Sequence, residues 1–149
     1  MKRKIIISAA VVLLVFFSIF CFLRHYYSVH GNKIKAIAID GAELKVEIAA
    51  TPAKRNLGLG GRSGLFASCG MLFEFPEEGV YPFWMKDMKF NLDMLWIAGD
   101  TIVEIKKNIP YSDGIGKTFV PTVLADKVLE INAGLSDKLG FKVGDKVGF

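Results

Sequence analysis

The sequence predicts a mainly β fold: a compact antiparallel sandwich or barrel with two short helices, preceded by one N-terminal transmembrane helix. Three observations predict it. A long apolar run without charges lies near the N-terminus, most later segments alternate apolar and polar residues, and only two later segments carry helix signals. Because strands without long intervening helices do not form βαβ units, we expect neighbouring strands to pair antiparallel.

The apolar run spans residues 5–23, IIISAAVVLLVFFSIFCFL, and contains no charge and only two serines. As a helix it would extend roughly 28 Å, close to the roughly 30 Å hydrocarbon core of a bilayer. A cleaved signal peptide is the competing interpretation, but its apolar region is usually roughly 7 to 15 residues long and ends in small residues. A lipoprotein signal would use Cys21, and the bulky Phe20 disfavours it. We therefore favour an uncleaved signal anchor.

Charges beside this run predict its orientation. Lys2, Arg3 and Lys4 precede it and Arg24 follows it, so the positive-inside rule places the N-terminus in the cytoplasm. The protein is then a single-pass protein of the cytoplasmic membrane with an extracytoplasmic C-terminal domain. The expected organisation is a cytoplasmic basic flank at 1–4, a transmembrane signal anchor at 5–23, a juxtamembrane linker at 24–32 and an exported mainly β domain at 33–149.

The net charge of +4 comes from the N-terminal segment. Four of the 19 basic residues precede residue 31, and the remaining 15 balance 15 acidic residues. A neutral domain lacks the basic surface that nucleic acids require, so we expect no nucleic-acid partner. The domain has one cysteine, Cys69, which excludes an internal disulfide. The Cys69 thiol could be buried as a free thiol or could form a disulfide between two chains, and the sequence leaves both alternatives open.

The domain begins with a predicted β-hairpin and a short helix. KIKAIAI at 33–39 and ELKVEIA at 43–49 alternate on either side of the turn signal Asp40–Gly41. Thr51, a capping hydroxyl before a proline, starts the helix TPAKRNL, which Gly58 ends. The loop 58–70 then holds five glycines, which implies unusual backbone angles or a close approach to a ligand or to another strand.

Further strands and a second helix complete the predicted domain. DKVLEINA precedes the helix LSDKLG, which we expect Ser136 to cap, and FKVGDKVGF forms a turn with strand ends. Residues 111–125 form a long loop. The strand segments are MLFEF (71–75), VYPFWM (80–85), FNLDMLWI (90–97), TIVEIKKNI (101–109) and DKVLEINA (126–133).

Several kinds of chemistry are absent from the domain's residues. Both histidines, His25 and His30, precede the domain, which excludes a Ser-His-Asp triad or a Cys-His dyad within it. The domain has no Cys/His cluster that could bind zinc, and it lacks the spacing of oxygen ligands that an EF-hand uses to bind calcium. Its glycine-rich loop matches no phosphate-binding fingerprint. We therefore expect no metal and no cofactor.

Carboxylates, basic side chains and aromatic rings are the remaining candidates for a site. Carboxylate pairs support acid/base or glycosidic chemistry without histidine, and aromatic platforms with a few polar groups bind small ligands. For each charge taken singly, a solvated strand face or turn is the alternative. The candidate ligand-binding residues are Arg55, Arg62, Trp84, Lys86, Asp87, Asp93 and Glu130.

The segment 82–97, PFWMKDMKFNLDMLWI, changes its alternation at one point. Apolar residues alternate with polar ones from Met88 to Trp96, which predicts a strand with one buried face that changes to burial on both faces at Leu95 and Ile97. Phe83 and Met85, however, occupy the opposite phase. A continuous strand would bury Lys86, at a large cost in free energy unless a carboxylate pairs with it. We favour the other possibility, a turn or bulge at Lys86 and Asp87.

The chain resembles the family called domain of unknown function 192. The resemblance rests on five blocks in order, GLGGRSGL, GMLFEF, FWMKDMKFNLDMLWI, VLEINAG and GFKVGD, and extends from about Leu44 to Val147. The sequence departs from the usual family pattern at Asn91, where members commonly carry proline. The resemblance implies a compact, mainly β domain, often exported or membrane-tethered, and supplies no catalytic residues to transfer.

Three functions follow as hypotheses. The first is a binding module for a small molecule or an envelope glycan, with Trp84 as the platform. The second is a structural or partner-docking domain of the cell envelope. The third is a hydrolase or lyase that works through Asp87 or Asp93 with Glu130 or Lys86 as partner, and it requires two of these groups in one cleft.

Overall fold

The computed structural model describes residues 12, 14–19, 31–114 and 116–149. The chain divides into two compact units, 1–31 and 32–149, and each is considered by itself. In the first unit, Val12 and residues 14–19 are helical. Most of the expected signal anchor, the basic flank and the linker up to residue 30 lie outside the described residues. Among the residues that are described, no helix is both long enough and apolar enough to cross a membrane.

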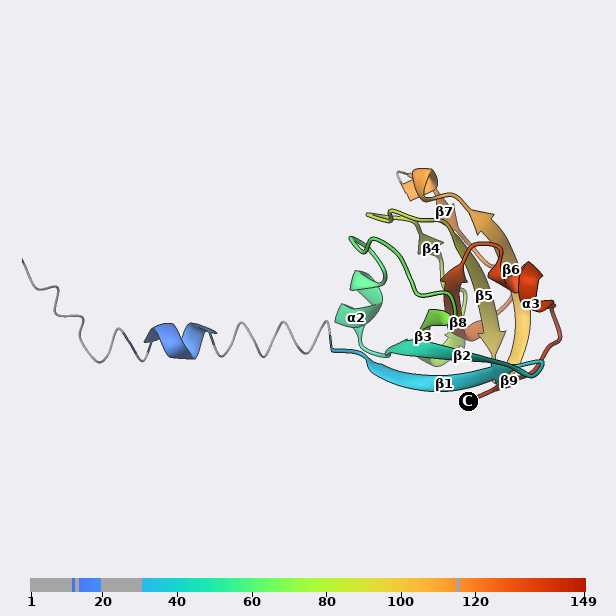
Figure 1. The fold of residues 1–149 in the computed structure, drawn as a ribbon, viewed down its shortest axis with the longest axis horizontal. Coiled ribbons are helices and arrows are strands. Elements are labelled where there is room, and N and C mark those ends of the chain that lie inside the picture. The colour runs from blue at the N-terminus through green and yellow to red at the C-terminus, as the bar shows by residue number, and fades with distance from the viewer. Residues whose placement is uncertain (1–11, 13, 20–30, 115) are drawn as a thin grey trace, which may run out of the picture. The chain divides into compact units, whose positions relative to one another are not determined.

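The second unit is built on one curled sheet of seven strands, in the order β6-β5-β8-β3-β2-β1-β9 (Figure 1). A second sheet contains only β4 and β7. The expected mainly β fold is confirmed. The strands are β1 Lys33–Ile39, β2 Ala42–Ala49, β3 Cys69–Gly79, β4 Phe83–Trp84, β5 Leu92–Ala98, β6 Thr101–Ile109, β7 Thr118–Phe119, β8 Ala125–Asn132 and β9 Val147–Gly148. The helices of this unit are α2 Pro52–Leu57, the 3-10 helix η1 Tyr111–Gly114 and α3 Leu135–Leu139.

One strand pair corrects the predicted antiparallel sandwich or barrel. β2 and β3 pair in parallel, with Lys45 opposite Cys69 and Ala49 opposite Phe73, whereas the other paired strands are antiparallel. A parallel pair needs a crossover of roughly a dozen or more residues, but this crossover does not need a long helix. Residues 50–68 provide it with α2 and the glycine-rich loop. The architecture is therefore a curled, half-barrel sheet that contains one parallel pair.

Local signals for the first hairpin and helix are confirmed, and the predicted cap of the last helix is wrong. β1 and β2 pair as a hairpin, and the Lys54 amide donates to the Thr51 hydroxyl over 3.3 Å at the start of α2. In α3 the N-cap is Gly134, and Ser136 lies inside the first turn, fully buried. The Ser136 side chain cannot cap α3 because it donates to a carboxylate on β5 instead.

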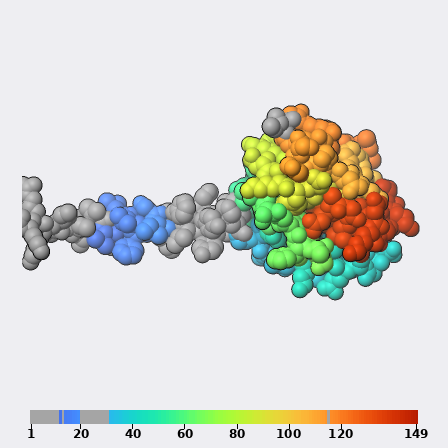
Figure 2. Space-filling view, turned by 45° about the horizontal axis from the view of Figure 1, so that its top comes forward, coloured from blue at the N-terminus to red at the C-terminus, as the bar shows by residue number. Residues whose placement is uncertain are grey.

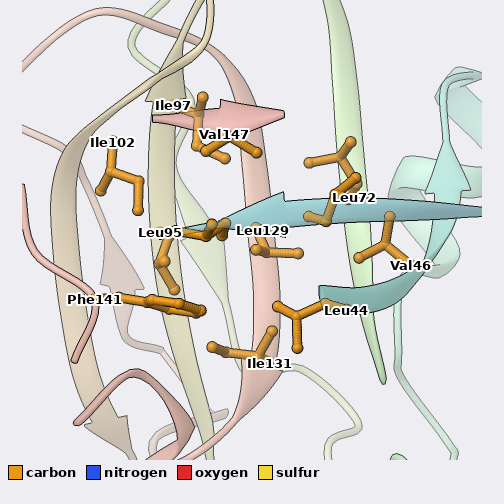
Figure 3. Close-up of a cluster of buried hydrophobic side chains, with 12 residues drawn as sticks. Leu44, Val46, Leu72, Leu95, Ile97, Ile102, Leu129, Ile131, Phe141 and Val147 are labelled. Atoms are coloured by element: carbon orange, nitrogen blue, oxygen red, sulfur yellow. The ribbon is translucent and has the colours of Figure 1, made fainter. Parts of the chain in front are cut away.

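Both faces of the sheet are covered, and successive residues of its central strands face different cores. Leu129 of β8 packs in one core, which Figure 3 shows, whereas its neighbour Val128 packs in the other. The first core consists of Ile37, Ile39, Leu44, Val46, Leu72, Leu95, Ile97, Ile102, Leu129, Ile131, Phe141 and Val147. The second consists of Ala49, Leu59, Met71, Phe73, Met85, Met88, Leu92, Met94, Trp96, Ile109, Ala125 and Val128. By this alternation Glu130 faces the second core.

The segment 82–97 is shorter as a strand than the alternation predicts. β5 begins only at Leu92, and its residues are buried on both faces from there to Ile97, including Asp93. The predicted start of the strand at Met88 and the predicted exposure of Asp93 are therefore wrong, because the first core covers the face on which Asp93, Leu95 and Ile97 lie. The burial on both faces predicted at Leu95 and Ile97 is confirmed. Asn91 just before β5 accepts a hydrogen bond at its side-chain oxygen from the Tyr111 amide over 3.0 Å, a bond that a proline there could not make.

Candidate functional site

A tight turn at Lys86 and Asp87 separates β4 from β5. The Met88 amide donates to the Met85 carbonyl over 3.2 Å, and Asp87 has a left-handed φ of 58°. Met85 is buried while Lys86 and Asp87 are exposed. The turn that we favoured at the break in alternation is confirmed, and Lys86 does not need a buried carboxylate.

Glycines on two other segments hold this turn in place. The Gly61 amide donates to the Asp87 carbonyl over 2.8 Å, and a Cβ on Gly60 would lie 3.3 Å from the Lys86 carbonyl. A Cβ on Gly114 of η1 would lie 2.4 Å from the Met85 carbonyl. Figure 1 shows the yellow-green turn near the green glycine-rich loop and the orange η1, and Figure 2 shows yellow and green residues side by side on the surface. The glycine-rich loop therefore makes its close approach to this turn.

A pocket of about 580 Å³, here called the Glu130 pocket, lies between the turn, the end of α2 and β8. Five of the seven candidate residues line it: Arg55, Trp84, Lys86, Asp87 and Glu130. The remaining lining comes from Asn56, Leu57, Gly58, Leu59, Gly60, Gly61, Phe73, Phe83 and Met88.

Glu130 is the buried polar residue of this pocket. Its exposed fraction is 4%, and its neighbours on the adjacent strands are Met71 of β3 and Met94 of β5, both fully buried. The residues that the structure describes make no hydrogen bond or ion pair with its carboxyl group, and burial alone raises its pKa to about 8. At neutral pH the carboxyl is therefore protonated and presents both a donor and an acceptor.

Trp84 is the exposed aromatic residue of the pocket. Its exposed fraction is 57%, and the Lys86 ammonium lies 5.5 Å from the centre of the ring. The adjacent Phe83 packs edge-on against Phe73, with ring centroids 4.8 Å apart, and against Trp96, 6.2 Å apart. Phe83 thus anchors β4 to the second core, and Trp84 is left to face solvent at the pocket.

Arg55 lines the pocket, but its side chain also holds the fold together. The guanidinium donates to the carbonyls of Ala50 over 2.7 Å and Glu74 over 2.8 Å, and it lies 4.9 Å from the Phe75 ring centre. These contacts tie α2 to β3. We therefore assign Arg55 a role in positioning one wall of the pocket.

Asp93 does not line the pocket. Its carboxylate is fully buried and accepts hydrogen bonds from the amides of Asn108 over 2.8 Å, Gly134 over 3.1 Å and Ser136 over 3.0 Å. The Ser136 hydroxyl donates to it as well, over 2.6 Å. The carboxylate thus joins β5, β6 and the start of α3, which explains a buried acid without a basic partner.

Arg62 lies in a different hollow, of about 440 Å³, which Cys69 and Phe66 also line. Its guanidinium makes two hydrogen bonds to the Glu47 carboxylate, over 2.5 and 2.9 Å. The Arg62 hydrogen bond lowers the pKa of Glu47, although burial opposes it, and the same bond raises the pKa of Arg62. The charges of Arg62 and Glu47 therefore balance each other in this hollow. Cys69 is a half-buried free thiol.

Sequence reasoning missed several residues of the Glu130 pocket. Phe73, Phe83 and Met88 belong to segments whose apolar pattern predicts core positions. Phe73 and Met88 are indeed buried. The backbone from Asn56 to Gly61 was missed as well. Its glycines were the available signal, because they mark a close approach of backbone to something. Which segment they approach depends on tertiary structure.

The pocket combines the buried carboxyl group of Glu130 with the exposed ring of Trp84 and with three charged side chains, Arg55, Lys86 and Asp87. Such a set can hold a hydroxyl-rich or amide-bearing ligand. Among the described residues, no group of three or more His, Cys, Asp or Glu side chains could hold a metal ion.

Comparisons with known proteins agree with this fold. A protein from Sinorhizobium meliloti 1021 described as a "putative transcription regulator" is 32% identical, with a TM-score of 0.73 over 78% of this chain and 93% of that one. A protein of unknown function from Novosphingobium aromaticivorans DSM 12444 is 31% identical, with a TM-score of 0.73 over 81% of this chain and 89% of that one. No curated protein matches. The family described as DUF192, Uncharacterized ACR, matches residues 35–149, and the chain therefore belongs to this family.

Proposed function

We propose that the domain is a binding module for a small, neutral, hydroxyl-rich or amide-bearing molecule, and that the Glu130 pocket is its site. The observation that carries the proposal is the carboxyl group of Glu130. It is almost fully buried, has no polar partner among the described residues and lines the pocket. A ligand that hydrogen-bonds to this carboxyl group would give a nearly buried polar group the partner that the described residues do not supply.

The pocket has no strong charge to select an ionic ligand, because Arg55 and Lys86 are positive, Asp87 is negative and a single positive charge is left over. Lys86 and Asp87 are adjacent and opposite in charge, and the Arg55 guanidinium already donates to two carbonyls. The protonated carboxyl of Glu130 adds no charge at neutral pH. Trp84 offers an apolar face of the kind on which sugar rings stack.

The N-terminal sequence supports an extracytoplasmic setting for this function. Residues 5–23 carry no charge and follow three basic residues. With such an anchor the domain would face the cell envelope, where glycans are abundant hydroxyl-rich ligands. A fragment of an envelope glycan is therefore our first candidate ligand.

The experiment is a thermal-shift screen of the full-length chain against envelope glycan fragments and neutral metabolites, followed by calorimetric titration of each hit. Glu130→Gln should keep the affinity, because a carboxamide also presents a donor and an acceptor. Glu130→Leu should lose it. Raising the pH above about 8 should weaken binding by the natural chain, whose carboxyl then ionises, but not by Glu130→Gln.

Matched variants separate binding from packing. Lys86→Ala and Asp87→Ala should weaken binding, whereas Lys89→Ala should leave it unchanged, because Lys89 is exposed just after the turn and does not line the pocket. Equal affinity for every hit in the natural chain and in Glu130→Leu would refute the proposed site.

Hydrolysis of a bound glycan is a second candidate function, since Asp87 and Glu130 line the same pocket. In glycoside hydrolysis a protonated carboxyl donates a proton to the leaving oxygen while a second carboxylate activates water or attacks the sugar. Glu130 would be the acid and Asp87 the second carboxylate. Asp93 cannot take this part because its carboxylate already accepts four hydrogen bonds.

Glu130→Gln distinguishes the two functions. The amide cannot donate a proton to a leaving group, so an enzyme with this substitution would still bind but release no product. Product release is measured by mass spectrometry of oligosaccharides incubated with each variant. Binding without product in the natural chain would leave the binding module as the function.

A further inference from the structure

Trp84 lies where three hollows meet. Besides the Glu130 pocket, it lines a hollow of about 250 Å³ and another of about 810 Å³. An exposed tryptophan that borders three hollows is not explained by packing. It is placed to contact a ligand that extends from one hollow into the next.

The smaller hollow, here called the aromatic hollow, continues the Glu130 pocket along one side. It shares Arg55, Phe73 and Phe83 with that pocket and adds Phe75 and Tyr81. The rings of Phe75 and Tyr81 stack with centroids 3.6 Å apart and planes 11° apart. This hollow therefore presents aromatic surface next to the polar base of the Glu130 pocket.

The larger hollow, here called the η1 hollow, shares Lys86, Asp87 and Met88 with the Glu130 pocket. Its other lining includes the exposed residue Tyr111 and Lys117, whose ammonium lies 2.6 Å from the Asp113 carboxylate. The Glu130 pocket and the η1 hollow thus share the turn at Lys86 and Asp87, although the rest of their lining comes from different segments. One side is built by α2, the glycine-rich loop and β8, and the other by η1 and the residues that lead to β7.

We propose that the ligand is a linear oligosaccharide of three or more units that lies across Trp84, with one unit at Glu130 and its neighbours in the aromatic and η1 hollows. This inference rests on the proposed function and narrows its ligand class. A single sugar would fill one hollow and leave the aromatic surface of the other two in water. A chain of sugars offers apolar ring faces for Trp84, Tyr81 and Tyr111, and hydroxyls for Lys86 and Asp87.

The experiment is calorimetric titration of the full-length chain in a zwitterionic detergent, because glycoside detergents would compete for the site. The probes are β-1,4-linked oligomers of N-acetylglucosamine and of glucose, from one to six units. For at least one series we expect affinity to rise about tenfold or more from one unit to four and then to level off, since each stacked ring adds a modest gain.

Two variants separate the gain with ligand length from the basal affinity. In Trp84→Ala, the affinity for the four-unit oligomer should exceed that for the single unit by less than about threefold, because the ring common to all three hollows is lost. Glu130→Leu should lower affinity at every length by a similar factor. Phe66→Ala is the control, since Phe66 is an even more exposed ring outside these three hollows and its loss should change nothing.

The outcomes separate this inference from the function on which it rests. Equal affinity for one unit and for four would overturn the extended ligand and leave the single Glu130 pocket in place. A length dependence that Trp84→Ala leaves unchanged would also overturn it. Failure of both series to bind at any length, at millimolar concentration, would overturn the glycan-binding function together with the inference.

Discussion

Glu130 on β8 lies directly opposite Met71 on β3, and both side chains are withdrawn from solvent. On its other side Glu130 faces Met94 of β5, which is also buried. The residues opposite Glu130 on both adjacent strands are thus methionines, whose side chains carry no charge. Burial of the carboxyl group disfavours its ionised form and raises the pKa of Glu130 to about 8.

The first prediction concerns stability against pH. The folded-state pKa of Glu130, about 8, exceeds its ordinary value of 4.5, so between these values the unfolded chain releases a proton that the folded chain keeps. The free energy of unfolding should therefore fall as pH rises from 4.5 to 8, by up to about 1.4 kcal/mol per pH unit, and stay constant above that range. Chemical denaturation at several pH values measures it.

Glu130→Gln is the control for this prediction, because it removes the titrating group and should flatten the decline. Glu47 and Glu104, whose pKa values are lowered, add stability that is lost only as pH falls below their usual range, so they do not contribute between 4.5 and 8. Parallel pH profiles for the natural chain and Glu130→Gln would show that Glu130 ionises in the folded state at ordinary pH.

The second prediction concerns Asp93. Asp93→Ala should lower the free energy of unfolding by about 3 kcal/mol or more, because it leaves several donors buried without an acceptor. Asp137→Ala is the matched control. Asp137 is exposed, and its carboxylate pairs with Lys107 at the surface, so its loss should cost less than about 1 kcal/mol. Urea denaturation of both variants tests the difference, and similar losses would contradict the structural role of Asp93.

Local signals in the sequence were enough for the elements that depend on neighbouring residues. The alternation around Asp40 and Gly41 predicts the first hairpin, and the Thr51-Pro52 pair predicts α2. The cost of burying a lysine was enough to predict the turn at Lys86. In each case the competing structures differ in free energy through contacts within a few residues.

Other features depend on contacts between distant segments, and local patterns do not contain them. The parallel pairing of β2 with β3 results from a crossover, and the burial of Glu130 from its position between β3 and β5. Asp93 looked like a candidate site residue because its partners, Asn108 and Ser136, are far away in sequence. A buried acid in a structural network and one in a site are indistinguishable until their partners are known.

The third prediction concerns the two arginines among the candidates. Arg55→Lys should weaken ligand binding and lower stability by about 1–2 kcal/mol. One guanidinium nitrogen donates to the carbonyls of both Ala50 and Glu74 while the group lies over the Phe75 ring, and a lysine ammonium has no planar group to place there, so α2 would be less firmly held. Arg62→Lys should leave ligand affinity unchanged, since Arg62 lies in a separate hollow with Glu47. Calorimetric titration of both variants with the same oligosaccharide tests this contrast, and an equal effect of the two substitutions would contradict it.

The last prediction concerns the close contact between η1 and the turn. A Cβ at Gly114 would lie 2.4 Å from the Met85 carbonyl oxygen, and both partners of this clash are backbone. Gly114→Ala must therefore displace η1 or the turn, and we expect a loss of about 1–3 kcal/mol of stability, as for other overpacked sites. Gly64→Ala is the matched control, because its Cβ would meet nothing within 4 Å. Since the turn carries Lys86 and Asp87, Gly114→Ala should also weaken ligand binding, whereas Gly64→Ala should not. Urea denaturation and calorimetry on the two variants measure both effects, and unchanged binding in a destabilised Gly114→Ala would show that the position of the turn does not matter to the ligand.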